Sequence, residues 1–201
     1  MKKLYKLLIV LLGSFLTGAG VPVMLSSNLG ADTLSCMIQG GVNHLGVTFG
    51  TVSIAFNIFL LMIVLLVDRS RIGVGTVLSI VIIGFTVDAI TPFFPDLSGA
   101  GLPLRVALML VGVVLIGIGV GSYAAADFGT APLDALVLIL THKTKLPLGV
   151  VRMFFDITMT IVGFLLGGPV GMGTVASVLL LGPIMNFFFR ATEKMLERIP
   201  Q

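Results

Sequence analysis

The chain has 201 residues, of which 57% are hydrophobic and 10% are charged, and its mean hydropathy is +1.16. Because about a quarter of the residues in a typical soluble domain are charged, this composition excludes a water-soluble domain and indicates a multi-pass protein whose first partner is the lipid bilayer. The single cysteine, Cys36, excludes an internal disulfide. The net charge of +3 comes from Lys and Arg scattered over short loops, which argues against nucleic acid as a partner and is typical of a topology signal.

Six apolar runs are long enough, or nearly so, to cross a hydrocarbon core of about 30 Å as α-helices. They are separated by short segments rich in glycine, proline or charged residues. The six predicted spans are Leu4 to Leu25, Phe49 to Val67, Gly73 to Ile90, Leu104 to Tyr123, Leu148 to Leu166 and Val170 to Phe189.

Two further apolar runs, 32–42 and 132–142, are too short to span and too apolar for ordinary loops. The first follows the first span and the second follows the fourth. We expect either an interfacial helix or a re-entrant half-helix at each place. The predicted fold class is therefore an all-α membrane protein with six transmembrane helices and two short helices.

The second half of the sequence repeats the first at an offset of 99 residues. The stretch Leu29-Gly30-Ala31-Asp32-Thr33-Leu34-Ser35 is matched by Phe128-Gly129-Thr130-Ala131-Pro132-Leu133-Asp134. Glycine positions in the long runs match at the same offset, and after a one-residue shift Gly73-Val74-Gly75-Thr76 meets Gly171-Met172-Gly173-Thr174. These matches predict a duplication with residues 1–98 as one three-span repeat and 99–201 as the other, together forming one membrane domain.

Three spans per repeat is an odd number, so the second repeat must enter the membrane from the opposite face. The repeats are thus expected to have inverted topology about a pseudo-two-fold axis in the membrane plane. Most basic residues then fall on one face, and only Arg105 borders the other. By the positive-inside rule both termini are cytoplasmic. The basic residues on the expected cytoplasmic face are Lys2, Lys3, Lys6, Arg69, Arg71, Lys143, Lys145, Arg190, Lys194 and Arg198.

The starts of the two short runs are the first candidate site. Asp32, Ser35 and Asp134 lie where a glycine-hinged helix begins, and Pro132 is favoured in a first helical turn. Such side chains either satisfy free backbone amides or line a central cavity toward which the half-helices point. Acidic groups there favour a cationic or hydrogen-bond-donating solute.

Asn57 and Asp156 are the second candidate site, because they are matched in the repeat and each lies about eight residues inside a span. A charged residue at that depth usually faces a bundle interior or an aqueous pathway. Arg152 precedes Asp156 by four residues, so the two are expected to form an ion pair on one helix face. The alternatives are a structural pair that holds helices together and a solute or proton site.

These motifs give the chain a likeness to a known group. It resembles the bacterial YczE/YyaS/YitT group of integral membrane proteins, and the YczE-like branch in particular, in residues 27–32, 46–51, 73–76 and 128–134. The resemblance implies a multi-pass topology in a bacterial inner membrane rather than a substrate. Many relatives have proline where this chain has Thr33, so we expect its two short helices not to be equivalent.

The sequence favours a small secondary transporter or exporter of a small, cationic or amphipathic solute, with a midplane site at the repeat interface. Asp32, Ser35, Asn57, Asp134, Arg152 and Asp156 are the predicted substrate-binding residues. The open alternatives are a non-transporting membrane partner or regulatory protein and a substrate-capturing subunit of a multi-component transporter. A homodimer and a membrane protein partner also stay open. Neither a catalytic set nor a metal-ligand spacing nor a cofactor motif is visible, so no enzyme activity, metal or cofactor is expected.

Overall fold

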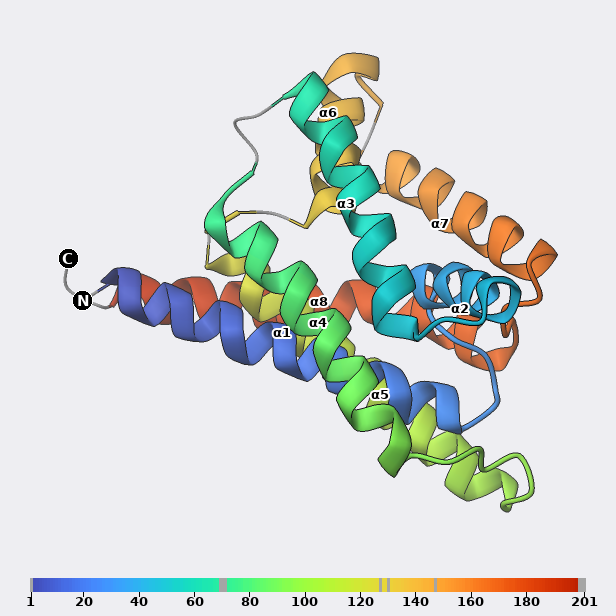
Figure 1. Cartoon of the computed structure of the whole chain (residues 1–201). Helices are drawn as coiled ribbons and strands as arrows, with labels where there is room; N and C mark the ends of the chain where they lie inside the picture. The colour runs from blue at the N-terminus through green and yellow to red at the C-terminus, as the bar shows by residue number, and fades with distance from the viewer. Residues whose placement is uncertain (1, 69–71, 127, 130, 147, 199–201) are drawn as a thin grey trace.

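The computed structural model describes residues 2–68, 72–126, 128–129, 131–146 and 148–198. Over these residues the chain forms eight α-helices and one short 3₁₀ helix and has no strand (Figure 1). The helices are α1 (Lys2–Ser26), α2 (Thr33–Leu45), α3 (Phe49–Val67), α4 (Val74–Ile90), η2 (Thr91–Phe93), α5 (Leu102–Ala125), α6 (Pro132–Thr144), α7 (Leu148–Leu165) and α8 (Met172–Glu197).

The predicted helical runs are confirmed within a few residues at most ends. The main difference is α8, which continues to Glu197 because residues 190–197 include good helix formers and no glycine or proline. Among the described residues, five helices are long and apolar enough to cross a membrane: α1, α3, α4 together with η2, α5 and α8. Three residues used in the sequence analysis, Arg69, Arg71 and Thr130, lie outside the described residues.

The most extensive helix contact joins α1 and α5. It is close because glycines from both helices face one another. A methyl group added at Gly13 would lie 2.8 Å from the carbonyl oxygen of Gly119, and one added at Gly20 would lie 2.9 Å from that of Gly112. Between transmembrane helices, such small residues let backbones approach and gain dispersion contacts that lipid does not supply.

Each helix of this central pair also packs on one outer helix. Ile83 and Thr86 of α4 pack against Gly18 of α1, and Leu181 and Ile184 of α8 pack against Gly117 of α5. The resulting core of α1, α4, α5 and α8 contains fully buried apolar side chains such as Met24, Val87 and Val113. These four helices form the frame on which the shorter elements are placed.

The two short helices each pack on a long helix from the other half of the chain: α2 lies against α7, and α6 lies against α3 (Figure 1). The segments that lead into them are fixed by backbone hydrogen bonds. The amide of Gly173 donates to the carbonyl of Leu29 at 2.7 Å, and the amide of Gly75 donates to that of Phe128 at 2.8 Å. Gly30, with φ of +110°, fits directly against Gly171, where a side chain would collide.

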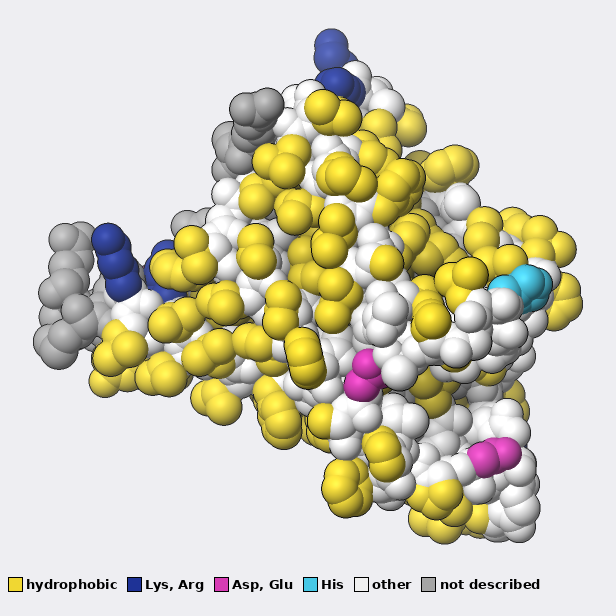
Figure 2. All heavy atoms as spheres, viewed as in Figure 1, with side chains coloured by type: hydrophobic (Ala, Val, Ile, Leu, Met, Phe, Trp, Pro, Cys, Tyr) yellow, Lys and Arg dark blue, Asp and Glu magenta, His cyan; other side chains and the backbone are white. Residues whose placement is uncertain are grey.

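The long helices expose much of their apolar surface. Phe59, Leu66, Phe164, Leu165 and Leu179 are each more than half exposed. Figure 2 shows hydrophobic side chains over most of one face, with Lys and Arg at its left and upper margins and acidic side chains toward the lower right. An apolar belt between charged margins is the surface expected of a protein embedded in lipid.

Candidate functional site

A cavity of about 960 Å³ lies among the helices of both halves of the chain. Its walls come from α1, α2, α3, α4, α5, α6, α7 and α8. All six residues predicted to bind substrate line it: Asp32, Ser35, Asn57, Asp134, Arg152 and Asp156. The structure thus brings together side chains separated by up to 124 positions in the sequence, although their binding role stays a prediction.

Asp32 begins α2 and acts as its N-cap. Its backbone is extended, with φ of −63° and ψ of 161°, and its Oδ2 accepts a hydrogen bond from the amide of Ser35 at 3.2 Å. This contact satisfies one of the amides that a helix leaves free in its first turn. The other carboxylate oxygen, Oδ1, is buried and has no hydrogen-bond partner among the described residues. The capping interpretation is therefore confirmed for one oxygen and leaves the second available.

Asp134 behaves differently although it occupies the place that matches Ser35. The N-cap of α6 is Ala131, Pro132 is the first helical residue as expected, and Asp134 lies in the first turn. Its Oδ1 accepts a hydrogen bond from Nη1 of Arg152 at 2.5 Å. The two short helices are not equivalent, as Thr33 and Pro132 led us to expect.

Arg152 also contacts Asp156 one turn further along α7, where the Nε to Oδ2 distance is 3.4 Å. The predicted ion pair at this spacing is confirmed. Asp156 Oδ1 in turn accepts a hydrogen bond from the hydroxyl of Thr33 at 2.8 Å. One charged network therefore connects α6, α7 and α2, and its three charged side chains are between 21% and 37% exposed at the cavity wall.

The matching positions in the first half carry no charge. Asn57 corresponds to Asp156 and Ser53 to Arg152, and the side-chain Nδ2 of Asn57 donates to the backbone carbonyl of Ser53 at 2.9 Å within α3. The positions in α3 that match the Arg152–Asp156 pair of α7 are thus neutral and polar.

A model of the "Family of unknown function (DUF6198)" matches residues 4–190 of the chain. The chain belongs to this family. The uncharacterized membrane protein YczE of Bacillus subtilis is 34% identical over 145 residues, which is 72% of this chain and 66% of that relative. An uncharacterized protein of Haemophilus influenzae is 29% identical over 95% of this chain and 87% of its own length. The uncharacterized protein YyaS of Bacillus subtilis is 22% identical over 91% and 92% of the two chains.

These similarities confirm the resemblance to the YczE-like group and the assignment as a membrane protein. No solved structure matches the chain.

Sequence reasoning missed several cavity residues in this DUF6198 chain. Thr33 reaches Asp156 from another helix, and Glu193 lines the cavity from the last third of α8. Asp88 does not line the cavity; it accepts hydrogen bonds from the backbone amide of Gly50 at 2.7 Å and from the hydroxyl of Thr48 at 2.6 Å. It caps α3 from α4. Of these residues, only Thr33 carried a signal in the sequence, because many relatives have proline at its position.

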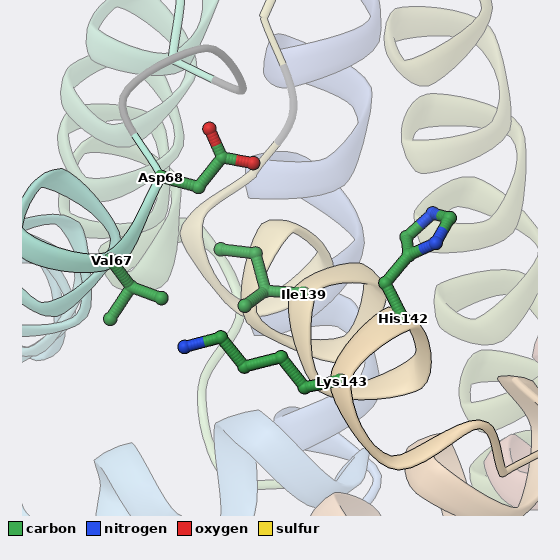
Figure 3. Close-up of a pocket in the computed structure, with 5 residues that line it drawn as sticks. All are labelled: Val67, Asp68, Ile139, His142 and Lys143. Atoms are coloured by element: carbon green, nitrogen blue, oxygen red, sulfur yellow. The ribbon is translucent and has the colours of Figure 1, made fainter.

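A second, smaller cavity of about 270 Å³ lies between the end of α3 and the last turns of α6. Figure 3 shows Val67 and Asp68 on one side of it and Ile139, His142 and Lys143 on the other. None of the six predicted site residues lines it. The larger cavity is therefore the candidate functional site.

Proposed function

We propose that this DUF6198 protein is a small secondary transporter of the bacterial cytoplasmic membrane, not an enzyme, and that its solute binds in the cavity between the two halves. The observation that carries the proposal is that cavity itself, with a volume of about 960 Å³ and polar side chains contributed by both halves. Solute sites in transporters built from inverted repeats lie at the repeat interface near broken or short helices.

The proposed architecture has six spans, with α7 as the sixth, in two inverted three-span repeats. Reciprocal contacts support it. Gly13 meets Gly119 while Gly20 meets Gly112, and these are the pairs that a two-fold axis would exchange at an offset of 99. The hydrogen bonds of Leu29 with Gly173 and of Phe128 with Gly75 are related in the same way once the one-residue shift before Gly171 is included.

The proposed topology places both termini in the cytoplasm. Figure 1 places the start of α1 and the end of α8 at the same end of the molecule, as an even number of spans requires. The basic side chains at the left and upper margins of Figure 2 then face the cytoplasm and follow the positive-inside rule.

Cysteine labelling tests the proposal without knowledge of the solute. Cys36 is the only cysteine, so a Cys36→Ser background accepts single cysteines at Ile83 or Leu181, which line the cavity from α4 and α8. An alternating-access transporter exposes both positions to a membrane-impermeant maleimide from each face of oriented vesicles.

The matched control is a cysteine at Ser98, which lies in the exposed loop before α5 and should react from the outer face alone. Labelling of both cavity positions from the same single face would contradict transport and favour a capturing subunit. If neither cavity position is labelled from any face, the result would favour a non-transporting membrane partner.

A further inference from the structure

The cavity wall carries more negative than positive charge. Four acidic side chains, Asp32, Asp134, Asp156 and Glu193, line it, and Arg152 is the one basic side chain among the described lining residues. Arg152 is already engaged by Asp134 and Asp156. If all these groups are ionised, their formal sum is −3, and Asp32 and Glu193 have no cation at the wall to balance them.

Asp32 is the acidic residue best prepared for a ligand. Its Oδ2 is held by the amide of Ser35, which fixes the carboxylate, while the buried Oδ1 has no partner among the described residues. A buried acceptor without a donor is unfavourable, so a bound hydrogen-bond donor would complete it. Asp156 is less available, since Thr33 and Arg152 occupy its two oxygens.

The surroundings of Asp32 add to its preference for a cation. Asp156 accepts a hydrogen bond from the hydroxyl of Thr33, the residue that follows Asp32, so both carboxylates lie at the start of α2. A positive group beside Asp32 is therefore attracted by two carboxylates, of which one is only partly neutralised by Arg152. An anion in the same place would be repelled by both.

The rest of the cavity is suited to an apolar body. Side chains from four helices form its hydrophobic wall: Phe49, Ile80, Ile83, Ile116, Leu181 and Met185. A volume of about 960 Å³ is at the upper end of the range for sites that bind drug-sized molecules. A small hydrated metal ion would leave this wall without contacts, whereas an organic cation uses both the carboxylate and the wall.

We propose that the solute is an amphipathic organic monocation with a protonated amine, and that the amine binds Oδ1 of Asp32 while the apolar body lies against the hydrophobic wall. Asp32, rather than Asp156, is then the residue that recognises the charge. Arg152 keeps Asp134 and Asp156 neutralised in the absence of solute. This inference rests on the proposed transport function for its biological meaning, but binding can be measured separately.

Three probes with one apolar body and different head groups test the charge: 4-phenylbutylamine, 4-phenylbutanol and 4-phenylbutyrate. Their binding to the full chain in lipid nanodiscs is measured by calorimetry and by thermal shift, since a ligand of the folded state raises its apparent stability. We expect the amine to bind at least about tenfold more tightly than the alcohol, and the carboxylate not to bind.

Asp32→Asn tests the anchor. Asparagine caps a helix about as well as aspartate, so α2 should begin as before while the charge is lost. The affinity for the amine should fall by about tenfold or more and the affinity for the alcohol should not change. Asp96→Asn is the matched control, because Asp96 lies in an exposed loop and contacts Ser98 outside the cavity. It should leave all three affinities unchanged.

Several outcomes would overturn the inference. Equal affinity for amine and alcohol, preference for the carboxylate, or binding of none of the probes would each exclude the proposed cation site, and these results need no variant. An unchanged amine affinity in Asp32→Asn would exclude Asp32 as the anchor. Labelling of the cavity from both faces without amine binding would support the transport proposal and refute the cation site. Amine binding with labelling from one face alone would support the cation site and refute transport.

Discussion

The contact between α1 and α5 predicts how the frame of the cavity responds to a single methyl group. In Gly112→Ala the new Cβ would lie 2.6 Å from Cβ of Met24, 2.8 Å from the Met24 amide nitrogen and 2.9 Å from the carbonyl oxygen of Gly20. Ordinary contact begins at 3.4 Å, so α1 must retreat by about 0.5 to 0.8 Å. Two of the three atoms are backbone, and a rotamer change cannot move them.

A gap of that size along a helix pair weakens many dispersion contacts at once. Overpacking of this kind costs about 1–3 kcal/mol. Because transmembrane helices remain helical when they separate, the helix propensity of alanine offsets little of this cost. We therefore expect Gly112→Ala to lower the free energy of unfolding by about 1–3 kcal/mol, measured by reversible denaturation in mixed micelles.

Gly182→Ala is the matched control within a long helix. A Cβ at Gly182 would meet nothing within 4 Å, because this residue of α8 faces the cavity. Its stability should stay within about 0.5 kcal/mol of the natural protein. Equal stability of the two variants would refute the close approach of α1 and α5 as the reason for glycine at position 112.

Three further predictions concern the site and the topology. Arg152→Met leaves Asp134 and Asp156 without their shared cation and should lower the free energy of unfolding by about 1–3 kcal/mol. The loss is smaller than for a fully buried pair because the Arg152 side chain is 37% exposed. Unchanged stability in denaturation would show that the charged network does not stabilise the fold. Gly182→Phe should fold normally but weaken 4-phenylbutylamine binding by about tenfold or more in calorimetry, and full affinity would mean that the probe binds elsewhere. A fluorescent reporter that folds only in the cytoplasm should be bright at either terminus, whereas a dark carboxyl-terminal fusion would contradict six spans.

The candidate site could be predicted in part. Asp32, Asn57, Asp134 and Asp156 stood out because polar side chains are costly in an apolar setting and because three of these positions are matched across the repeat. The pairing of Arg152 with Asp156 followed from helical spacing alone. The partners of the remaining oxygens could not be foreseen, since Thr33 and Asp156 lie 123 positions apart and meet only when α2 packs on α7.

The sequence by itself determined the helices, because the interactions that form a helix are local. Apolar runs, glycines and the proline at the start of α6 set the helices within a few residues at most ends, because hydropathy and backbone hydrogen bonds act between near neighbours. The identities of the helix neighbours came only from the tertiary structure. Lipid tails are as apolar as the side chains, so burial does not select partners in a membrane; close packing at glycines does. That packing formed the cavity and left Oδ1 of Asp32 without a partner among the described residues.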